Sequence, residues 1–194
     1  MYNNPKQTSG FSLLQMMAVI AIAGVLMAAA IPTFRDMIRR TRLTAYANEF
    51  VTALNMARSE SIKRGVTVTL RKIGGTGTYW STSGWEVFVD TNANGTKDTG
   101  EDTIKTYNAL PINYTLVGTN SNIANYLSYK PDGMTNVITP SFILCDNSDG
   151  NNTIEPHTAR IIYIKTGRIR MARDSNGDGI PENDSNVNVT SCGL

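Results

Sequence analysis

The sequence predicts an α+β fold in which one long N-terminal helix packs on an antiparallel β-sheet head. A charge-free apolar run opens the chain, a helical stripe of apolar residues follows it, and after residue 65 apolar residues begin to alternate with polar ones. These patterns are typical, in turn, of a membrane-length helix, an amphipathic helix and half-buried strands. We therefore expect a single helix with two different halves, followed by a β-rich globular part.

The apolar run extends from Phe11 to Phe34, 24 residues without a charged side chain. As a helix it would rise roughly 36 Å, which is enough to cross the hydrocarbon core of a bilayer. A polar leader with Lys6 as its only charge precedes the run, whereas a secretory signal peptide is cleaved after its apolar core. We expect residues 1–10 to be a leader peptide and residues 11–38 to be the transmembrane half of the helix.

A cluster of arginines follows the apolar run directly and consists of Arg35, Arg39, Arg40 and Arg42. The positive-inside rule would place such a cluster in the cytoplasm. An exported head conflicts with that rule, and a dedicated assembly system would resolve the conflict.

The helical period continues after the arginines as one apolar stripe with spacings of four and three. Its members are Leu43, Ala47, Phe50, Leu54 and Ala57. Lys63 and Arg64 suit the negative end of a helix dipole, and Gly65 is a good C-terminal cap. We expect one helix from about Phe11 to Arg64, whose second half lies against the head.

The pattern changes to period two at Val66, where Val66, Val68 and Leu70 alternate with polar residues. Further strands are expected between turns rich in Gly and Asn. They are Trp85–Val89, Thr103–Tyr107, Tyr114–Val117, Tyr126–Tyr129, Ser141–Cys145, Arg160–Lys165 and Arg168–Arg173. We therefore expect antiparallel sheets in the head, residues 39–194.

Composition and charge exclude several functions. Hydrophobic residues make up 41% and charged residues 18% of the chain, as in a folded protein, and the net charge of +2 creates no global field for nucleic acid. Binding of DNA would therefore need a local patch. The single histidine, His157, stands in a Pro-containing turn region, and no serine nucleophile motif is present, so we expect no enzymatic activity.

The chain has two cysteines, Cys145 and Cys192, both in its polar part. An even number of cysteines in an exported domain favours one disulfide, which would tie the C-terminal tail to an internal strand. The alternative is two unrelated buried thiols.

A basic segment lies between Arg160 and Arg173, with five basic residues and no acidic one. On a strand, Arg168 and Arg170 would point to the same side with Cα atoms about 6.6 Å apart, and Gly167 would allow the tight turn that displays them. Two adjacent guanidinium groups suit phosphate oxygens. Lys165, Arg160 and Arg173 would widen the patch. The alternative is that arginines on an edge strand only prevent aggregation.

Two loops carry oxygen-bearing side chains at alternate positions. The first has Asp90, Asn92, Asn94, Asp98 and Glu101, which fits the spacing of a Ca²⁺ loop, although a strand rather than a helix precedes it. The alternative is a hairpin loop that uses Asn, Asp and Gly for turn chemistry alone. The second loop has Asp174, Asn176, Asp178, Glu182 and Asp184, lacks an acidic twelfth residue, and its carboxylates could mask the basic patch.

The N-terminal segment Gly10-Phe11-Ser12-Leu13-Leu14 resembles the prepilin peptidase site of type IV pilins and type II secretion pseudopilins. The resemblance implies cleavage after Gly10 and N-methylation of Phe11. Pro32 stands where such pilins often have a helix-kinking proline. Gln15 departs from the family pattern, which has a Glu that pairs with the terminal ammonium of a neighbouring subunit during assembly.

The head resembles the FimT/FimU/GspH group in the segments Gly84–Asp90, Pro131–Gly133, Ser141–Cys145 and Thr166–Arg170. In FimT-type competence pilins a Gly-Arg-x-Arg motif is associated with DNA capture, and Gly167–Arg170 matches its fixed positions.

The resemblance therefore implies the type IV pilin fold and a minor pilin that binds extracellular double-stranded DNA in natural transformation. Its other partners would be pilins, the bacterial inner membrane and the prepilin peptidase. Its head would face the periplasm before the subunit joins the pilus at the cell surface. The alternative is a structural minor pilin or a type II secretion pseudopilin that primes assembly without binding DNA.

Overall fold

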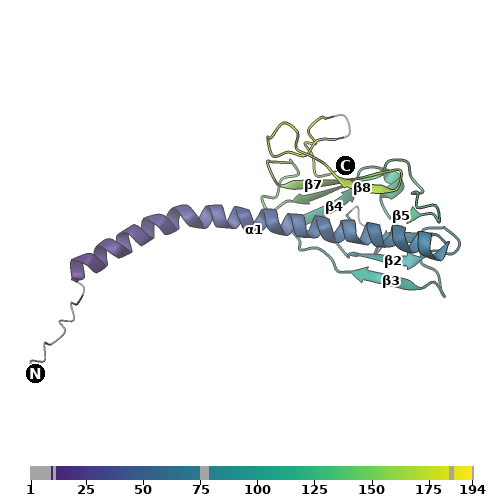
Figure 1. The fold of residues 1–194 in the computed structure, drawn as a ribbon, viewed down its shortest axis with the longest axis horizontal. Helices are drawn as coiled ribbons and strands as arrows, with labels where there is room; N and C mark the ends of the chain where they lie inside the picture. The colour runs from purple at the N-terminus through teal and green to yellow at the C-terminus, as the bar shows by residue number, and fades with distance from the viewer. Residues whose placement is uncertain (1–9, 11, 75–78, 184–185, 194) are drawn as a thin grey trace, which may run out of the picture. The chain divides into compact units, whose positions relative to one another are not determined.

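The computed structural model describes residues 10, 12–74, 79–183 and 186–193. The chain divides into two units, Met1–Arg39 and Arg40–Leu194. Helix α1, Leu13–Arg64, belongs to both units, and the strands belong to the second unit (Figure 1). The predicted single helix is confirmed for the described residues, and Phe11 lies outside them.

The ends of α1 are capped by local hydrogen bonds. The backbone N–H of Ser12 donates to Oε1 of Gln15 at 3.0 Å, which is one half of a capping box. Gly65, with a φ of +67°, donates its N–H to the carbonyl of Ser61 and ends the helix. Pro32 lies inside α1 and does not end it.

The first half of α1 is apolar on all sides. Its side chains, such as Leu14, Ile20 and Leu26, are exposed in the protein. Among the described residues one helix, α1, is long and apolar enough to span a membrane by its length and composition. This exposed apolar surface would need lipid or other apolar helices as its surroundings.

Within the described residues, eight strands form two antiparallel four-stranded sheets with the orders β3-β2-β1-β5 and β4-β6-β7-β8. The first sheet contains β1 (Val68–Lys72), β2 (Trp85–Val89), β3 (Thr103–Tyr107) and β5 (Tyr126–Tyr129). The second contains β4 (Tyr114–Gly118), β6 (Ser141–Asp146), β7 (Ala159–Lys165) and β8 (Arg168–Met171). A short 3₁₀ helix, η1 (Ser121–Ile123), was not predicted.

All eight predicted strands are present, and their ends differ by at most two residues. The first begins at Val68 rather than Val66, because the chain is still leaving the helix cap at Gly65. The last ends at Met171 rather than Arg173. The carbonyl of Arg173 accepts the N–H of Glu182 and is therefore committed to the C-terminal loop.

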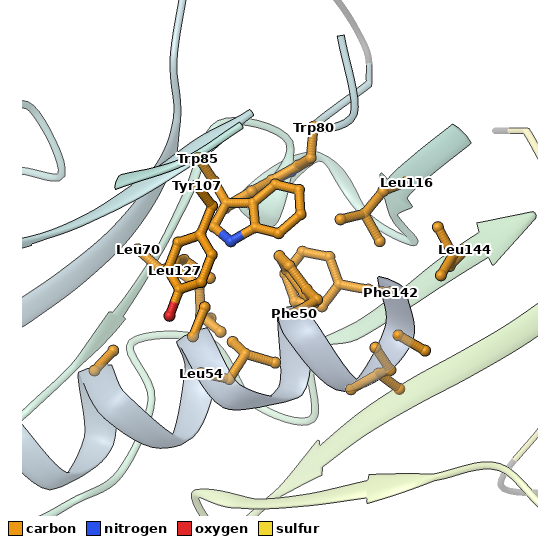
Figure 2. Packing of buried hydrophobic residues seen from close by; sticks show 14 of the residues in the cluster. Phe50, Leu54, Leu70, Trp80, Trp85, Tyr107, Leu116, Leu127, Phe142 and Leu144 are labelled. Carbon is orange, nitrogen blue, oxygen red and sulfur yellow. The ribbon is translucent and has the colours of Figure 1, made fainter. Parts of the chain in front are cut away.

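The core forms where the second half of α1 meets both sheets (Figure 2). Phe50 is fully buried and makes edge-to-face contacts with Trp80, Trp85 and Phe142 at centroid distances of 5.8, 5.2 and 4.8 Å. The predicted stripe from Leu43 to Ala57 is buried along its whole length. The prediction that this half of the helix lies against the head is therefore confirmed.

The second sheet is covered on both faces. Ile162 and Ile164 of β7 belong to the core under α1, whereas Ala159 and Ile161 belong to a second cluster on the opposite face. That second cluster contains the disulfide between Cys145 and Cys192, whose Cα atoms are 5.9 Å apart. The predicted disulfide is thus confirmed, and it holds the C-terminal segment on the face of the sheet away from α1.

Candidate nucleic-acid interface

The hairpin β7–β8 presents three cations on one face. In the strand register Lys165 lies opposite Arg168, and Tyr163 lies opposite Arg170. Directly opposed residues of antiparallel strands point to the same side of a sheet, so these four side chains share a face. Ile169 and Met171 alternate with the arginines and pack toward the main core. The packing of these two apolar residues therefore leaves Arg168 and Arg170 exposed.

The turn of the hairpin consists of Thr166 and Gly167, with φ values of 49° and 73°. Two positive φ angles in a two-residue connection are typical of the type I′ turn that suits twisted hairpins. Gly167 is also buried, and a Cβ atom on it would lie 2.0 Å from the carbonyl oxygen of Gly133. Two features therefore require glycine at this position of the Gly-Arg-x-Arg motif. They are its positive φ angle and the close approach of Gly133 in the loop after β5.

A groove of about 790 Å³ opens beside the hairpin. Its lining includes the cations Lys165, Arg170 and Arg173. The C-terminal segment contributes Ser175, Glu182, Asn183 and Asn186 to the same lining. The hydroxyl of Tyr163 donates to the carbonyl oxygen of Glu182 at 3.0 Å and joins the hairpin to that segment. The disulfide holds the same segment further along the chain.

We call Lys165, Arg168, Arg170 and Arg173 the basic patch. Among the described residues, none of these four side chains forms an ion pair. The carboxylate of Glu182 is mostly buried in the groove and accepts the backbone N–H of Ser175 at 3.3 Å. The patch therefore concentrates four cations that form no ion pair among the described residues, and the buried carboxylate of Glu182 lines the groove beside three of them.

The acidic loop after the patch binds its own backbone. Asp174 accepts the N–H groups of Gly177 and Gly179 at 2.8 and 2.7 Å. Asp178 accepts the N–H of Ile180, and this hydrogen bond, followed by one from Asn188, lowers the pKa of its carboxyl group. Both carboxylates thus accept hydrogen bonds from their own loop. Of the other two carboxylates that were expected to mask the patch, Glu182 lines the same groove as Arg170 and Arg173, and Asp184 lies outside the described residues.

Arg160 does not belong to the basic patch, which corrects the sequence prediction. It lies on the face of β7 that packs against α1, where its Nη2 donates to Oγ1 of Thr44 at 3.2 Å and its Nη1 donates to the carbonyl of Ala159. Residues 160 and 165 differ by an odd number along one strand, so their side chains point to opposite sides. This signal was present in the sequence.

The predicted Ca²⁺ loop is the connection between β2 and β3, and its oxygen atoms accept hydrogen bonds from the loop itself. Buried Asp90 accepts the N–H groups of Asn94 and Gly95 and the hydroxyl of Thr69. Asp98 accepts the side-chain amides of Asn92 and Asn94, and Glu101 accepts the N–H groups of Thr91 and Asp98. In the part of the chain that the structure describes, no three His, Cys, Asp or Glu residues are grouped to hold a metal. The oxygen atoms of this loop therefore stabilise the turn itself, and their role as Ca²⁺ ligands stays a prediction.

The residues predicted for processing and assembly lie at the start of α1. Gly10 is exposed, a Cβ atom added to it would meet nothing within 4 Å, and Phe11 lies outside the described residues. Gln15 caps the helix, and its predicted role between subunits stays a prediction.

Sequence reasoning missed the residues that support and flank the patch. Gly133 was noted only as part of a segment that resembles the FimT/FimU/GspH group, and Asn186 was not connected with the patch. No local pattern brings Gly133 close to Gly167, or places Asn186 in the same groove as Arg170, because these residues lie on loops that are distant in sequence.

The helix, the two sheets and the C-terminal disulfide define the type IV pilin fold. The crystal structure of the type IV minor pilin FimU of Pseudomonas aeruginosa (strain PAO1) superposes with a TM-score of 0.55 and 17% identity, covering 79% of this chain and 96% of FimU. At this identity the likeness concerns the fold alone.

The chain belongs to the family described as Type II transport protein GspH, which it matches over residues 46–158. Two curated relatives, both fimbrial proteins of Pseudomonas aeruginosa, are each 42% identical over 60 residues, or 31% of this chain. The match spans 38% of the length of these relatives. Family and fold together identify a GspH-family protein with the type IV pilin fold, whose N-terminal helix is long and apolar enough to span a membrane by its length and composition.

Proposed function

We propose that this chain is a minor type IV pilin that binds extracellular double-stranded DNA during natural transformation. The binding residues are Lys165, Arg168, Arg170 and Arg173, and Gly167 positions them. Before assembly the head lies in the periplasm, and a prepilin peptidase cleaves after Gly10 and yields an N-methylated Phe11.

One observation carries the DNA proposal: a cluster of exposed cations, unpaired in the described residues, lies on an edge hairpin. β8 ends the order β4-β6-β7-β8, so within the described residues no further strand pairs with its outer edge. Phosphate oxygens are the acceptors that pairs of guanidinium groups bind best. Because the patch has no element shaped to enter a DNA groove, it would contact the phosphate backbone and tolerate any sequence.

The salt dependence of binding tests this proposal quantitatively. We would titrate a labelled duplex of arbitrary sequence with the full chain in detergent and follow fluorescence anisotropy at several salt concentrations. If all four cations neutralise phosphates, log K should fall against log[salt] with a slope of about −3.6. Arg168→Ala/Arg170→Ala should weaken binding and reduce the slope to about −1.8.

Lys105→Ala provides the matched control. Lys105 is exposed on β3, which is an edge strand of the other sheet. If edge-strand cations serve only to prevent aggregation, neither Lys105→Ala nor the arginine variant should change the affinity for DNA. The proposal requires loss of binding in the arginine variant and unchanged binding in the lysine variant.

The second candidate function is assembly priming without DNA binding, as a structural minor pilin or type II secretion pseudopilin whose partners are other pilins. The GspH family match and the FimU-like fold favour it. Absence of DNA binding by the unmodified chain at low salt would refute the first proposal and leave this one.

A further inference from the structure

A second pair of arginines lies on the opposite face of the second sheet from the basic patch. Oγ1 of Thr44 accepts a hydrogen bond from Nη2 of Arg160 at 3.2 Å and donates to the backbone carbonyl of Arg40 at 2.9 Å. Thr44 therefore links the start of β7 to the turn of α1 that begins at Arg40. Both arginines belong to the second unit of the chain.

In the part of the chain that the structure describes, this pair of arginines carries its positive charge without an ion-pair partner. Arg160 is half-buried, and burial, followed by the nearby charge of Arg40, lowers its pKa. Within the described residues neither Arg40 nor Arg160 forms an ion pair with a carboxylate, although Asp36 stands one helical turn before Arg40. Two adjacent guanidinium groups, one of them partly desolvated, repel each other unless an anion lies between them.

We propose that Arg40 and Arg160 bind the phosphate of an anionic phospholipid headgroup. The position in the chain argues for lipid as the source of that phosphate. Arg40 comes six residues after Phe34, the end of the uncharged run, and six helical residues rise only about 9 Å. The headgroup region of each leaflet extends about 5–8 Å beyond the hydrocarbon core, and an arginine side chain reaches back toward it.

Arg42 allows a sharp test of this geometry. Successive helical residues are rotated by about 100°, so Arg42 points to nearly the opposite side of α1 from Arg40. Both residues are exposed and carry the same charge at nearly the same distance from the apolar run. A general attraction of positive charge to anionic lipid would use both residues, whereas the proposed site uses Arg40 and not Arg42.

Native mass spectrometry of the full chain in detergent provides the assay. The chain would be titrated with dioleoylphosphatidylglycerol or with dioleoylphosphatidylcholine, and inorganic phosphate would be added as a competitor in a separate arm. We expect tighter binding of phosphatidylglycerol and little competition by free phosphate. Arg40→Gln and Arg160→Gln should each weaken phosphatidylglycerol binding about fivefold. Arg42→Gln and Arg168→Ala/Arg170→Ala should leave it unchanged.

Arg40→Gln decides the outcome, because an exposed helical residue can be replaced without disturbing the core. Unchanged lipid affinity in that variant, or an equal loss in Arg42→Gln, would overturn the proposal. Displacement of the lipid by an equal concentration of inorganic phosphate would also overturn it, since the site would then serve free phosphate. None of these results depends on whether the chain binds DNA.

Discussion

Replacement of Gly167 by alanine should destabilise the head more than the same change at a glycine with the same backbone angle. Gly167 and Gly150 have φ values of 73° and 77°. A Cβ atom at Gly150 meets nothing within 4 Å, whereas one at Gly167 would lie 2.0 Å from the carbonyl oxygen of Gly133. Gly167→Ala and Gly150→Ala therefore introduce similar backbone strain, but only Gly167→Ala adds a steric clash with Gly133.

The strain of a left-handed alanine is about 1–2 kcal/mol, and the lower entropy of the unfolded chain offsets about 0.4–1 kcal/mol of it. Gly150→Ala should therefore cost about 1 kcal/mol or less. Gly167→Ala must also displace the Gly133 loop, and we expect a total cost of about 3 kcal/mol, since overpacking costs about 1–3 kcal/mol.

Urea denaturation of the full chain in detergent measures both costs. The two tryptophans, Trp80 and Trp85, are fully buried against Phe50, so their fluorescence reports on the head. Equal destabilisation of the two variants would refute the contact between the hairpin turn and the Gly133 loop. If the contact is right, Gly167→Ala should also weaken DNA binding although every arginine of the patch is retained.

Three further results follow from the structure. Phe50→Ala should lower the free energy of unfolding by about 4 kcal/mol, because it opens a cavity among three aromatic rings. Phe50→Leu should lower the free energy of unfolding by less than half as much. Equal decreases in the two variants would show that ring packing is unimportant there. Cys192→Ser should destabilise the head by about 4 kcal/mol, since the disulfide closes a 47-residue interval, and unfolding in the presence and absence of reductant checks this in the unmodified chain. Burial raises the pKa of Glu101, but hydrogen bonds from Asp98 and Thr91 outweigh this effect and hold the pKa below its ordinary value of 4.5. The charged carboxylate therefore stabilises the fold above pH 4.5, and this contribution is lost as the pH falls further. Unfolding midpoints measured on both sides of pH 4.5 should therefore change less with pH in Glu101→Gln than in the unmodified chain. Equal changes of the midpoint with pH in the two proteins would contradict this.

The basic patch shows how positive charge can be displayed without a strongly basic protein. Ile169 and Met171 pack inward, the type I′ turn sets the register, and the same register brings Lys165 beside Arg168. The carboxylate of Asp174, which follows the patch in sequence, accepts N–H groups of its own loop. Among the described residues no carboxylate forms an ion pair with the patch, although acidic residues stand next to it in the chain.

The sequence by itself determined the elements of this protein. The helical period from Leu43 to Ala57, the cap at Gly65 and the strand patterns are local properties, and the structure contains each of these elements with strand ends within two residues of the prediction. The same alternation placed Arg168 and Arg170 on one side of a strand. It also contained the signal that separates Arg160 from them.

Only the tertiary structure decided what each of these faces meets. Arg160 lies toward Thr44, Gly167 lies against Gly133, and Glu182 closes the groove beside Arg170. Periodicity states which residues share a side, but the partner of that side depends on sheet order and loop packing across long separations in sequence. For the same reason the spacing of the loop at Asp90 could not show that Asp90 accepts the N–H groups of Asn94 and Gly95, and Ca²⁺ binding by this loop stays a prediction.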